Sequence, residues 1–461
     1  MLEKNHLEFF SSIVGAAECK SEPLYLKGYA YDATRERFEP SCVLYPQNEA
    51  QISRILSYCN ANKIPVVARG AGSGMSGGAL PCAQGVVLAM EKYFNEILEI
   101  DKKNMLARVQ PAVINKVFQN AVEKEGLFYP PDPASQDFST LGGNVSENAG
   151  GMRAAKYGIT KDYVLALRMV LPNGEIIRAG KKTIKDVAGY NLAGLLCASE
   201  GTLGVITEIT LKLLSKPKLS CVMMASFESI DDAMHAVCEI MASGVTPVAM
   251  EFLDALTLEA IEARFHKGIG KGAGALLITQ VDGDIAEMIE YQRAKIQEVF
   301  WQNHCLEFRS ASDEMEAAEI WFARRNASQS LSLYGKKKLN EDITIPRGNL
   351  PALLEGIAKI SEKYGLKIPC FGHAGDGNVH VNIMVRDPRD KEELARGEAA
   401  VEELFRLTIA LEGTLSGEHG IGLAKAPFMH LAFSKAEMEL FRAIKRAFDP
   451  NNILNPSKMG L

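Results

Sequence analysis

A glycine-dense segment near the N-terminus constrains the fold of this chain more than any other feature. Residues 70–78 hold five glycines, and they follow an apolar run at residues 64–68 that is typical of a strand. A G-x-G-x-x-G spacing begins at Gly72, but it indicates a βαβ dinucleotide loop only when a helix follows. Here another strand-like run follows, at residues 85–90. We therefore expect a loop that joins strand to strand and presents backbone N–H groups to an anion such as a pyrophosphate.

Two further glycine-rich patches lie at residues 140–151 and 200–204, and we expect both to be loops. A tight surface turn needs only one or two glycines. Three such segments suit a large dinucleotide that is contacted along its length. The patches therefore favour a cofactor site over isolated turns.

The remaining sequence predicts a chain that mixes helices and strands. Residues 216–218 form a polar break, after which helical and strand patterns start again, so we place a domain boundary there. Ser434 and Glu437 form a capping box, which predicts the start of a C-terminal helix. With 461 residues, two or three structural units are expected. Apolar periodicity predicts helices over 52–59 and 114–121 and strands at 42–45, 164–171, 204–211 and 275–281.

Composition excludes several classes of protein. Hydrophobic residues make up 47% and charged residues 23%, which is typical of a globular protein. The net charge is −6 and no long basic run occurs, so nucleic acid is not an expected partner. The nine cysteines form no C-x-x-C pair, and the chain shows neither a signal peptide nor a transmembrane segment. We expect a cytoplasmic protein, with peripheral attachment to the inner face of a membrane through a partner left open.

Histidines gather in two short motifs in the C-terminal half. His373 and His380 flank a turn, and residues 379–383 alternate with period two, so His380 and Asn382 share one strand face. Two imidazoles brought together across a turn are a common start of a divalent metal site, and Glu418 is the candidate carboxylate ligand. Read without other information, a histidine of this kind is more often a hydrogen-bonded surface or core residue than a metal ligand.

Taken in order, the motifs RGAGSG, PPDPAS, TLGGN, NAGG, EGTLGVITE, GHAGDGNVHVN and GEHGIG resemble the vanillyl-alcohol-oxidase and p-cresol-methylhydroxylase superfamily of FAD-binding proteins. The match is closest to its D-2-hydroxyacid dehydrogenase branch, which includes glycolate oxidase catalytic subunits and D-lactate dehydrogenases. It covers residues 37–458. The resemblance implies an α+β fold with a two-part FAD-binding domain of that superfamily's type and a cap of antiparallel sheet and helices. The FAD-binding domain would span residues 1–216, with its core at 37–216, the cap 217–420, and a C-terminal segment at 421–461 would return to the FAD-binding domain.

The resemblance also assigns the cofactor residues. Some superfamily members attach the flavin covalently through a His or Cys, but neither occurs in residues 69–76 or 148–158, so noncovalent FAD is expected. The pyrophosphate would lie on Arg69, Gly70, Ala71, Gly72, Ser73, Gly74 and Ser76. The rest of FAD would contact Pro131, Asp132, Ser135, Gly142, Gly143, Asn144, Ser146, Asn148, Gly151, Glu200, Gly201, Ile206 and Asn455.

The same resemblance implies the chemistry. His373, His380 and Glu418 would bind zinc or manganese, and His419 would be the catalytic base. The substrate would be bound by Arg324, whose planar fork suits a carboxylate, together with Ser328, Asn382 and His419. Members that handle a dicarboxylate carry a further lysine where this chain has Asn340, with lysines at 336–338 nearby, so the resemblance argues against a second carboxylate in the substrate.

The implied activity is oxidation of a small 2-hydroxy acid, D-lactate or glycolate, to the 2-oxo acid. No cysteine spacing in this chain suits an iron–sulfur cluster, so the electrons would have to leave FAD for an acceptor outside the chain. The expected acceptor is not NAD but a protein, a quinone, or an iron–sulfur or flavoprotein partner subunit. D-2-hydroxyglutarate oxidation, a noncatalytic FAD electron-transfer subunit and a flavin-using transferase of the alkyl-dihydroxyacetone-phosphate synthase type remain alternatives.

Overall fold

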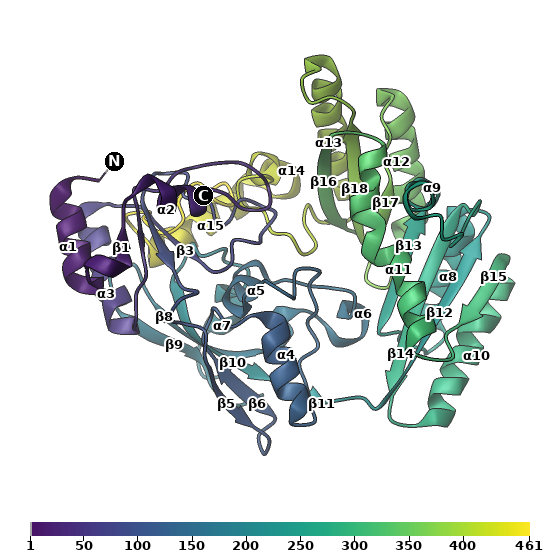
Figure 1. The fold of residues 1–461 in the computed structure, drawn as a ribbon, viewed down its shortest axis with the longest axis horizontal. Helices are drawn as coiled ribbons and strands as arrows, with labels where there is room; N and C mark the ends of the chain where they lie inside the picture. The colour runs from purple at the N-terminus through teal and green to yellow at the C-terminus, as the bar shows by residue number, and fades with distance from the viewer. Residues whose placement is uncertain (1) are drawn as a thin grey trace. The chain divides into compact units, whose positions relative to one another are not determined.

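The structure is a computed structural model that describes residues 2–461, and the chain divides into two compact units (Figure 1). Unit 1 comprises residues 2–150, 159–216 and 418–461, and unit 2 comprises residues 151–158 and 217–417. Glu418 and His419 therefore belong to unit 1, whereas the domain bounds expected from the sequence place them in the cap. No helix in residues 2–461 is long and apolar enough to cross a membrane.

Unit 1 is built around two main sheets. The first has the strand order β1-β2-β4-β3, and the second has the order β5-β6-β10-β8-β9. The strands of unit 1 are β1 (Cys19–Lys20), β2 (Cys42–Leu44), β3 (Val66–Arg69), β4 (Val86–Ala89), β5 (Ile97–Asp101), β6 (Leu106–Val109), β7 (Leu127–Phe128), β8 (Val164–Val170), β9 (Ile176–Gly180), β10 (Val205–Lys212) and β11 (Leu214–Ser215). Its helices are α1 (Lys4–Val14), α2 (Pro23–Gly28), α3 (Glu49–Asn62), α4 (Asn115–Lys124), α5 (Leu141–Glu147), α7 (Leu192–Leu196), α14 (Met429–Ala432) and α15 (Lys435–Phe448).

The glycine-dense loop joins two strands, as its sequence predicts. It leads from β3 to β4, which pair in parallel with Val66 opposite Val86. The patch at residues 140–151 is not a loop throughout, because α5 occupies its centre. Glycines are weak helix formers, but the Thr140 side chain accepts a hydrogen bond from the Gly143 backbone N–H and caps this helix.

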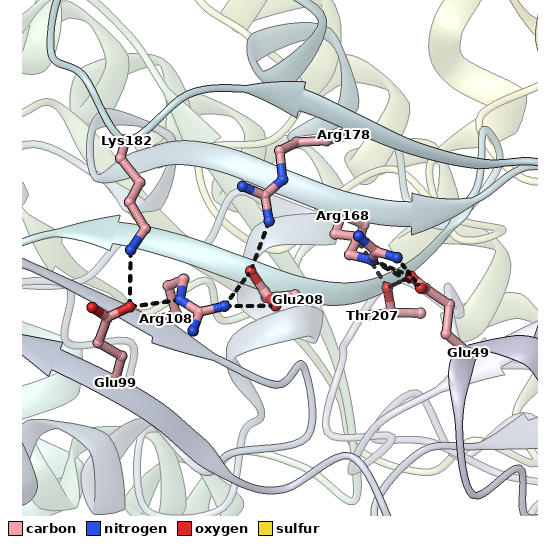
Figure 2. A network of polar contacts seen from close by, with 8 residues as sticks. All are labelled: Glu49, Glu99, Arg108, Arg168, Arg178, Lys182, Thr207 and Glu208. Atoms are coloured by element: carbon pink, nitrogen blue, oxygen red, sulfur yellow. Dashed lines mark hydrogen bonds and ion pairs between the residues drawn. The ribbon is translucent and has the colours of Figure 1, made fainter.

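The antiparallel sheet of unit 1 has one apolar and one charged face. Its apolar face packs against α4, α5 and α7 through a core that includes Phe118, Val145 and Leu196. On the charged face, Arg108 joins Glu99 to Glu208 across β5, β6 and β10 at 2.7 and 3.2 Å (Figure 2). A second pair, Arg168 of β8 with Glu49 of α3 at 2.6 Å, and the Thr207 hydroxyl bonded to Glu49 tie α3 to the sheet. This alternation is the pattern of an antiparallel sheet with one solvated face.

Unit 2 is one antiparallel sheet with helices on both faces. Its strand order is β15-β12-β14-β13-β17-β18-β16. The strands are β12 (Leu219–Phe227), β13 (Ala249–Asp254), β14 (Ala275–Gly283), β15 (Cys305–Ser310), β16 (Lys337–Thr344), β17 (Cys370–His373) and β18 (Asn378–Val385). The helices are α6 (Ala154–Tyr157), α8 (Ile230–Ala242), α9 (Ala255–Phe265), α10 (Ala286–Gln302), α11 (Glu314–Ser330), α12 (Leu350–Tyr364) and α13 (Lys391–Ala410).

The two faces of this sheet bury different kinds of residue. Helices α10 and α13 lie on the face that carries Phe227 and Ile383. Helices α9 and α11 lie on the opposite face, where their apolar residues pack with Leu253, Phe371 and Met384. Glu251, His373 and His380 lie on this second face too, because each is an even number of residues from one of these apolar side chains. Strand alternation therefore places the polar cluster beside the apolar core of the α9 and α11 face.

Candidate functional site

A pocket in unit 1 is enclosed by the three glycine-rich segments. Most of the cofactor residues expected from the sequence line it: Arg69, Gly70, Ala71, Gly72, Ser73, Gly74, Ser135, Gly142, Gly143, Asn144, Ser146, Glu200, Gly201, Ile206 and Asn455. Ser139 and Glu147 also line it, and each has a buried side-chain oxygen with no hydrogen-bond partner among the described residues. A pocket that combines bare backbone with unsatisfied polar atoms fits a large polar cofactor such as FAD.

The first loop of this pocket requires glycine. Gly72 has φ +65°, and a Cβ there would lie 2.1 Å from Nη2 of Arg69. That guanidinium donates to the carbonyl oxygens of Ala79 at 3.3 Å and Tyr31 at 2.7 Å, so it ties the two ends of the loop to each other and to the preceding chain. Arg69 thus shapes the loop in addition to lining the pocket.

Five of the expected cofactor residues lie outside the pocket lining. The carbonyl of Ser76 accepts the backbone N–H groups of Leu423 and Ala424 and so holds the segment that follows His419. Pro131 offers its carbonyl to the Asn115 and Gln119 amides. Asn148 ends α5 at φ 57°. Asp132 is buried, and Gly151 lies in the short segment that belongs to unit 2. Their contact with FAD stays a prediction.

His419 and Glu418 line the same pocket in unit 1. Both side chains are half-buried, and Gly150 comes so close to Glu418 that a Cβ on it would lie 3.2 Å from Oε2. The histidine expected to act as base therefore lies in the wall of the pocket that the glycine segments form.

Two carboxylates to which the sequence assigns no such role lie against the loop around His419, and one of them holds it. Glu200 accepts the backbone N–H groups of Ile421 and Gly422, each at 2.7 Å. Glu147 reaches the same turn, since a Cβ on Gly420, which has φ +86°, would lie 1.9 Å from its Oε2. Burial, with the neighbouring Glu200 charge second, raises the pKa of Glu147 well above its usual range. The glycines that flank His419 were the only sequence signal for this close approach.

The histidines of unit 2 lie side by side on the polar face of its sheet. His373 of β17 and His380 of β18 have ring centroids 5.2 Å apart, with their planes at 82°. Nδ1 of His373 lies 2.6 Å from Oε1 of Glu251, and Nδ1 of His380 lies 3.7 Å from Oδ1 of Asp342. Each ring thus turns its Nδ1 toward a carboxylate. The His373 contact is a hydrogen bond of the kind that metal-binding histidines commonly make to a carboxylate, whereas the His380 contact is too long for one. Both rings leave Nε2 directed away from these carboxylates, so the pair fits a divalent ion.

Arg324 lies in the same cluster. Its Nε donates to Oε2 of Glu251 at 2.6 Å, and its guanidinium carbon lies 4.9 Å from the centre of the Phe371 ring. Glu251 is fully buried; burial raises its pKa, but His373 and Arg324 bring it below the ordinary value overall. The neighbouring Arg325 is exposed and donates to the Ala318 carbonyl, as expected of a surface residue.

The other expected substrate residues have protein partners. The Ser328 hydroxyl, one turn after Arg324 on α11, accepts a hydrogen bond from Nζ of Lys338 at 2.7 Å. Asn382 is fully buried, and its side-chain amide donates to the Pro369 and His380 carbonyls. Its Oδ1 has no hydrogen-bond partner among the described residues and can accept a hydrogen bond. In the sequence Lys338 is only a charge near this site, and its pairing with Met384 of β18 places it on this face.

A flavoprotein of two units, one with a glycine-lined pocket and one with an antiparallel sheet covered by helices, is the class that these features define. The chain matches the family model described as "FAD linked oxidases, C-terminal domain" over residues 216–459 and the "FAD binding domain" model over residues 40–180. It belongs to the FAD-linked oxidase family.

Individual proteins agree with this assignment. The chain is 44% identical to the glycolate oxidase subunit GlcD of Bacillus subtilis over 94% of this chain and 91% of that protein. It is 32% identical to a D-lactate dehydrogenase of Anaerostipes hadrus over 91% of this chain and 89% of that one. The structure of p-cresol methylhydroxylase with substrate bound superposes with a TM-score of 0.82 at 19% identity, covering 99% of this chain and 96% of that chain. The expected fold class is thereby confirmed.

Proposed function

We propose that this protein oxidises a small 2-hydroxy acid, glycolate or D-lactate, to the corresponding 2-oxo acid. The observation that carries the proposal is the presence of His419 in the wall of the glycine-lined pocket. Relatives named glycolate oxidase subunit and D-lactate dehydrogenase support the same substrate class.

His419 is the base in this proposal. It removes the proton of the substrate's 2-hydroxyl group, a role for which an imidazole near neutral pH is well suited. Two hydrogen bonds from the loop's backbone to Glu200 keep the loop in one conformation, so the imidazole is held in place before substrate arrives. When bound, noncovalent FAD supplies the acceptor for the hydride from C2.

Arg324 binds the substrate carboxylate in the same proposal. Its planar guanidinium can pair with a carboxylate through two parallel hydrogen bonds, and Glu251 fixes its orientation through Nε. His373, His380 and Glu418 would hold a divalent ion, zinc or manganese, which would supply Lewis acidity toward the 2-hydroxyl oxygen. Ser328 and Asn382 add hydrogen-bonding groups on the same face of unit 2.

Anaerobic flavin reduction tests the proposal. The purified holoprotein is mixed without oxygen with glycolate, D-lactate or L-lactate while the visible flavin absorbance is followed, and its metal content is measured on the same sample. Glycolate or D-lactate should bleach the flavin. His419→Asn should keep its FAD and lose about 10²- to 10⁴-fold in reduction rate, the usual contribution of a positioned base. His430→Asn, an exposed histidine in the same C-terminal segment, is the control. Bleaching of the His419→Asn protein at the wild-type rate would exclude His419 as the base.

One observation favours a second substrate. Nζ of Lys338 bonds to Ser328, so a second cation lies near Arg324 on one face of the unit 2 sheet. A dicarboxylate such as D-2-hydroxyglutarate could use it. Including D-2-hydroxyglutarate in the mixing experiment decides between the two, because a dicarboxylate enzyme would reduce its flavin at much lower concentrations of that acid.

The reduced flavin must then pass its electrons on. We propose a non-NAD acceptor, either a quinone or a partner protein that carries an iron–sulfur cluster or a flavin. The name of the Bacillus subtilis relative, a subunit, supports a partner protein. A noncatalytic relay role is disfavoured by the His419 pocket, which a relay subunit would not need.

A further inference from the structure

A single carboxylate joins two groups that the proposed function uses for different purposes. Oε1 of Glu251 lies 2.6 Å from Nδ1 of His373, and Oε2 accepts a hydrogen bond from Nε of Arg324 at 2.6 Å. All three side chains belong to unit 2, and the Glu251 side chain is fully buried. Both of its oxygens are therefore engaged by groups of the proposed site.

We infer that Glu251 is a positioning residue that sets both the tautomer of His373 and the orientation of Arg324. The inference rests on the proposed function, because it gives His373 a metal and Arg324 a carboxylate to bind. Glu251 touches neither ligand in this scheme and acts only through its two neighbours.

The donor and acceptor chemistry makes the role specific. Nε of an arginine can only donate, so Oε2 of Glu251 must accept. The oxygens of an ionised carboxylate only accept, so Nδ1 of His373 must carry the proton at the other end. A neutral imidazole with its proton on Nδ1 has its lone pair on Nε2, which is the form that binds a metal through Nε2. Glu251 thus selects the metal-binding tautomer while it holds the guanidinium.

Backbone register explains why this position carries the carboxylate. Glu251 of β13 is paired directly with His373 of β17, so the two side chains emerge side by side on one face of the sheet. Arg324 reaches the same point from α11, which packs over that face. No other described carboxylate contacts both His373 and Arg324 in the hydrogen bonds of the structure.

Glu251→Gln separates the two functions, because an amide has one acceptor and one donor end. Arg324 has no alternative tautomer, so the amide oxygen should stay with Arg324 and the NH₂ should face His373. His373 must then accept at Nδ1 and carry its proton on Nε2, which prevents metal binding there. The substitution should therefore weaken metal binding far more than substrate binding.

The experiment measures Zn²⁺ affinity of chelator-stripped, FAD-loaded protein by competition with a chromophoric chelator. Glu251→Gln should weaken Zn²⁺ binding about 10- to 100-fold, the usual effect of losing such a partner. The KM for glycolate at saturating Zn²⁺ should change by less than about threefold, a fraction of 1 kcal/mol. Asp254→Asn is the matched control: Asp254 lies on the same strand, is half-buried and accepts the backbone N–H groups of Thr257 and Cys370. It should bind Zn²⁺ like the wild type.

If Glu251→Gln does not yield folded, FAD-containing protein, the buried Arg324 charge can be removed with its partner. Glu251→Met with Arg324→Met is then compared with Arg324→Met alone. The double variant should bind Zn²⁺ at least tenfold more weakly than Arg324→Met, because Arg324→Met keeps the Glu251 carboxylate at His373 and the double variant does not. Equal Zn²⁺ affinity in either comparison would overturn the inference. Wild-type protein that neither binds Zn²⁺ nor reduces its flavin with 2-hydroxy acids would instead overturn the proposed function.

Discussion

Replacing Glu200 with Gln tests whether the loop around His419 is held by its two buried hydrogen bonds. The two oxygens of Glu200 accept the backbone N–H groups of Ile421 and Gly422, each at 2.7 Å. A glutamine offers only one oxygen, so its NH₂ group would face the other backbone N–H. One charge-assisted hydrogen bond is lost, which corresponds to about 1.5–3 kcal/mol.

Loss of this hydrogen bond should lower the rate of flavin reduction more than the free energy of unfolding. Burial raises the pKa of Glu200, so the carboxylate is itself costly to bury, and a neutral amide recovers part of that cost. The ordered conformation of the loop around His419 gains nothing from the neutral amide and loses one hydrogen bond. If the ordered loop becomes 1.5–3 kcal/mol less favourable, the fraction of protein with an ordered loop falls, and the rate of flavin reduction falls about 10- to 150-fold. We expect FAD content to stay near that of the wild type.

Stopped-flow flavin reduction by glycolate, in the absence of oxygen, measures this effect. Glu208→Gln is the control, because Glu208 lies on the charged face of the sheet (Figure 2) and does not line the pocket. In the wild type the rate should fall as the pH decreases through the raised pKa of Glu200, since protonation removes an acceptor, and Glu200→Gln should lack that step. Wild-type rates in Glu200→Gln with full FAD content would refute the reasoning, and so would loss of FAD with no other change.

Three further substitutions address the fold and the cofactor loop. Gly72→Ala imposes a left-handed φ on a residue with a Cβ and displaces Arg69. The resulting strain of about 1–3 kcal/mol should weaken FAD binding at least severalfold in a cofactor titration. Unchanged FAD affinity would contradict the loop geometry. Lys445→Met leaves the buried Asp449 carboxylate without its cation at 2.5 Å and should lower the free energy of unfolding by roughly 3–5 kcal/mol in denaturant titrations. Burial raises the pKa of Asp254 from 3.8 to about 6, so the stability of the wild type relative to Asp254→Asn should fall by about 2 kcal/mol as the pH rises from 4 to 6. A constant difference would show that this carboxyl is not shifted.

Several features of this protein follow from the sequence alone. Local periodicity and capping are encoded within a few residues, so α3, α4, β8 and β10 appear where their patterns predict them, and the Ser434 capping box begins α15. The loop from β3 to β4 was also predictable, because a dense run of glycines after a strand has few other uses. The motif order was enough to indicate the FAD-linked oxidase fold.

Tertiary structure alone decided which isolated charged residues cooperate. Nothing local distinguishes Glu251 from any other acidic residue on a strand; its partners lie 73 and 122 positions away, and strand register and helix packing bring them together. Glu200 lies 221 residues from the Ile421 amide that it accepts. The helix α5 was missed because its glycines disfavour a helix, while its cap and its packing in the unit 1 core stabilise one. Sequence patterns encode short-range preferences, whereas a buried carboxylate acquires its role only from the donors that the folded chain places around it.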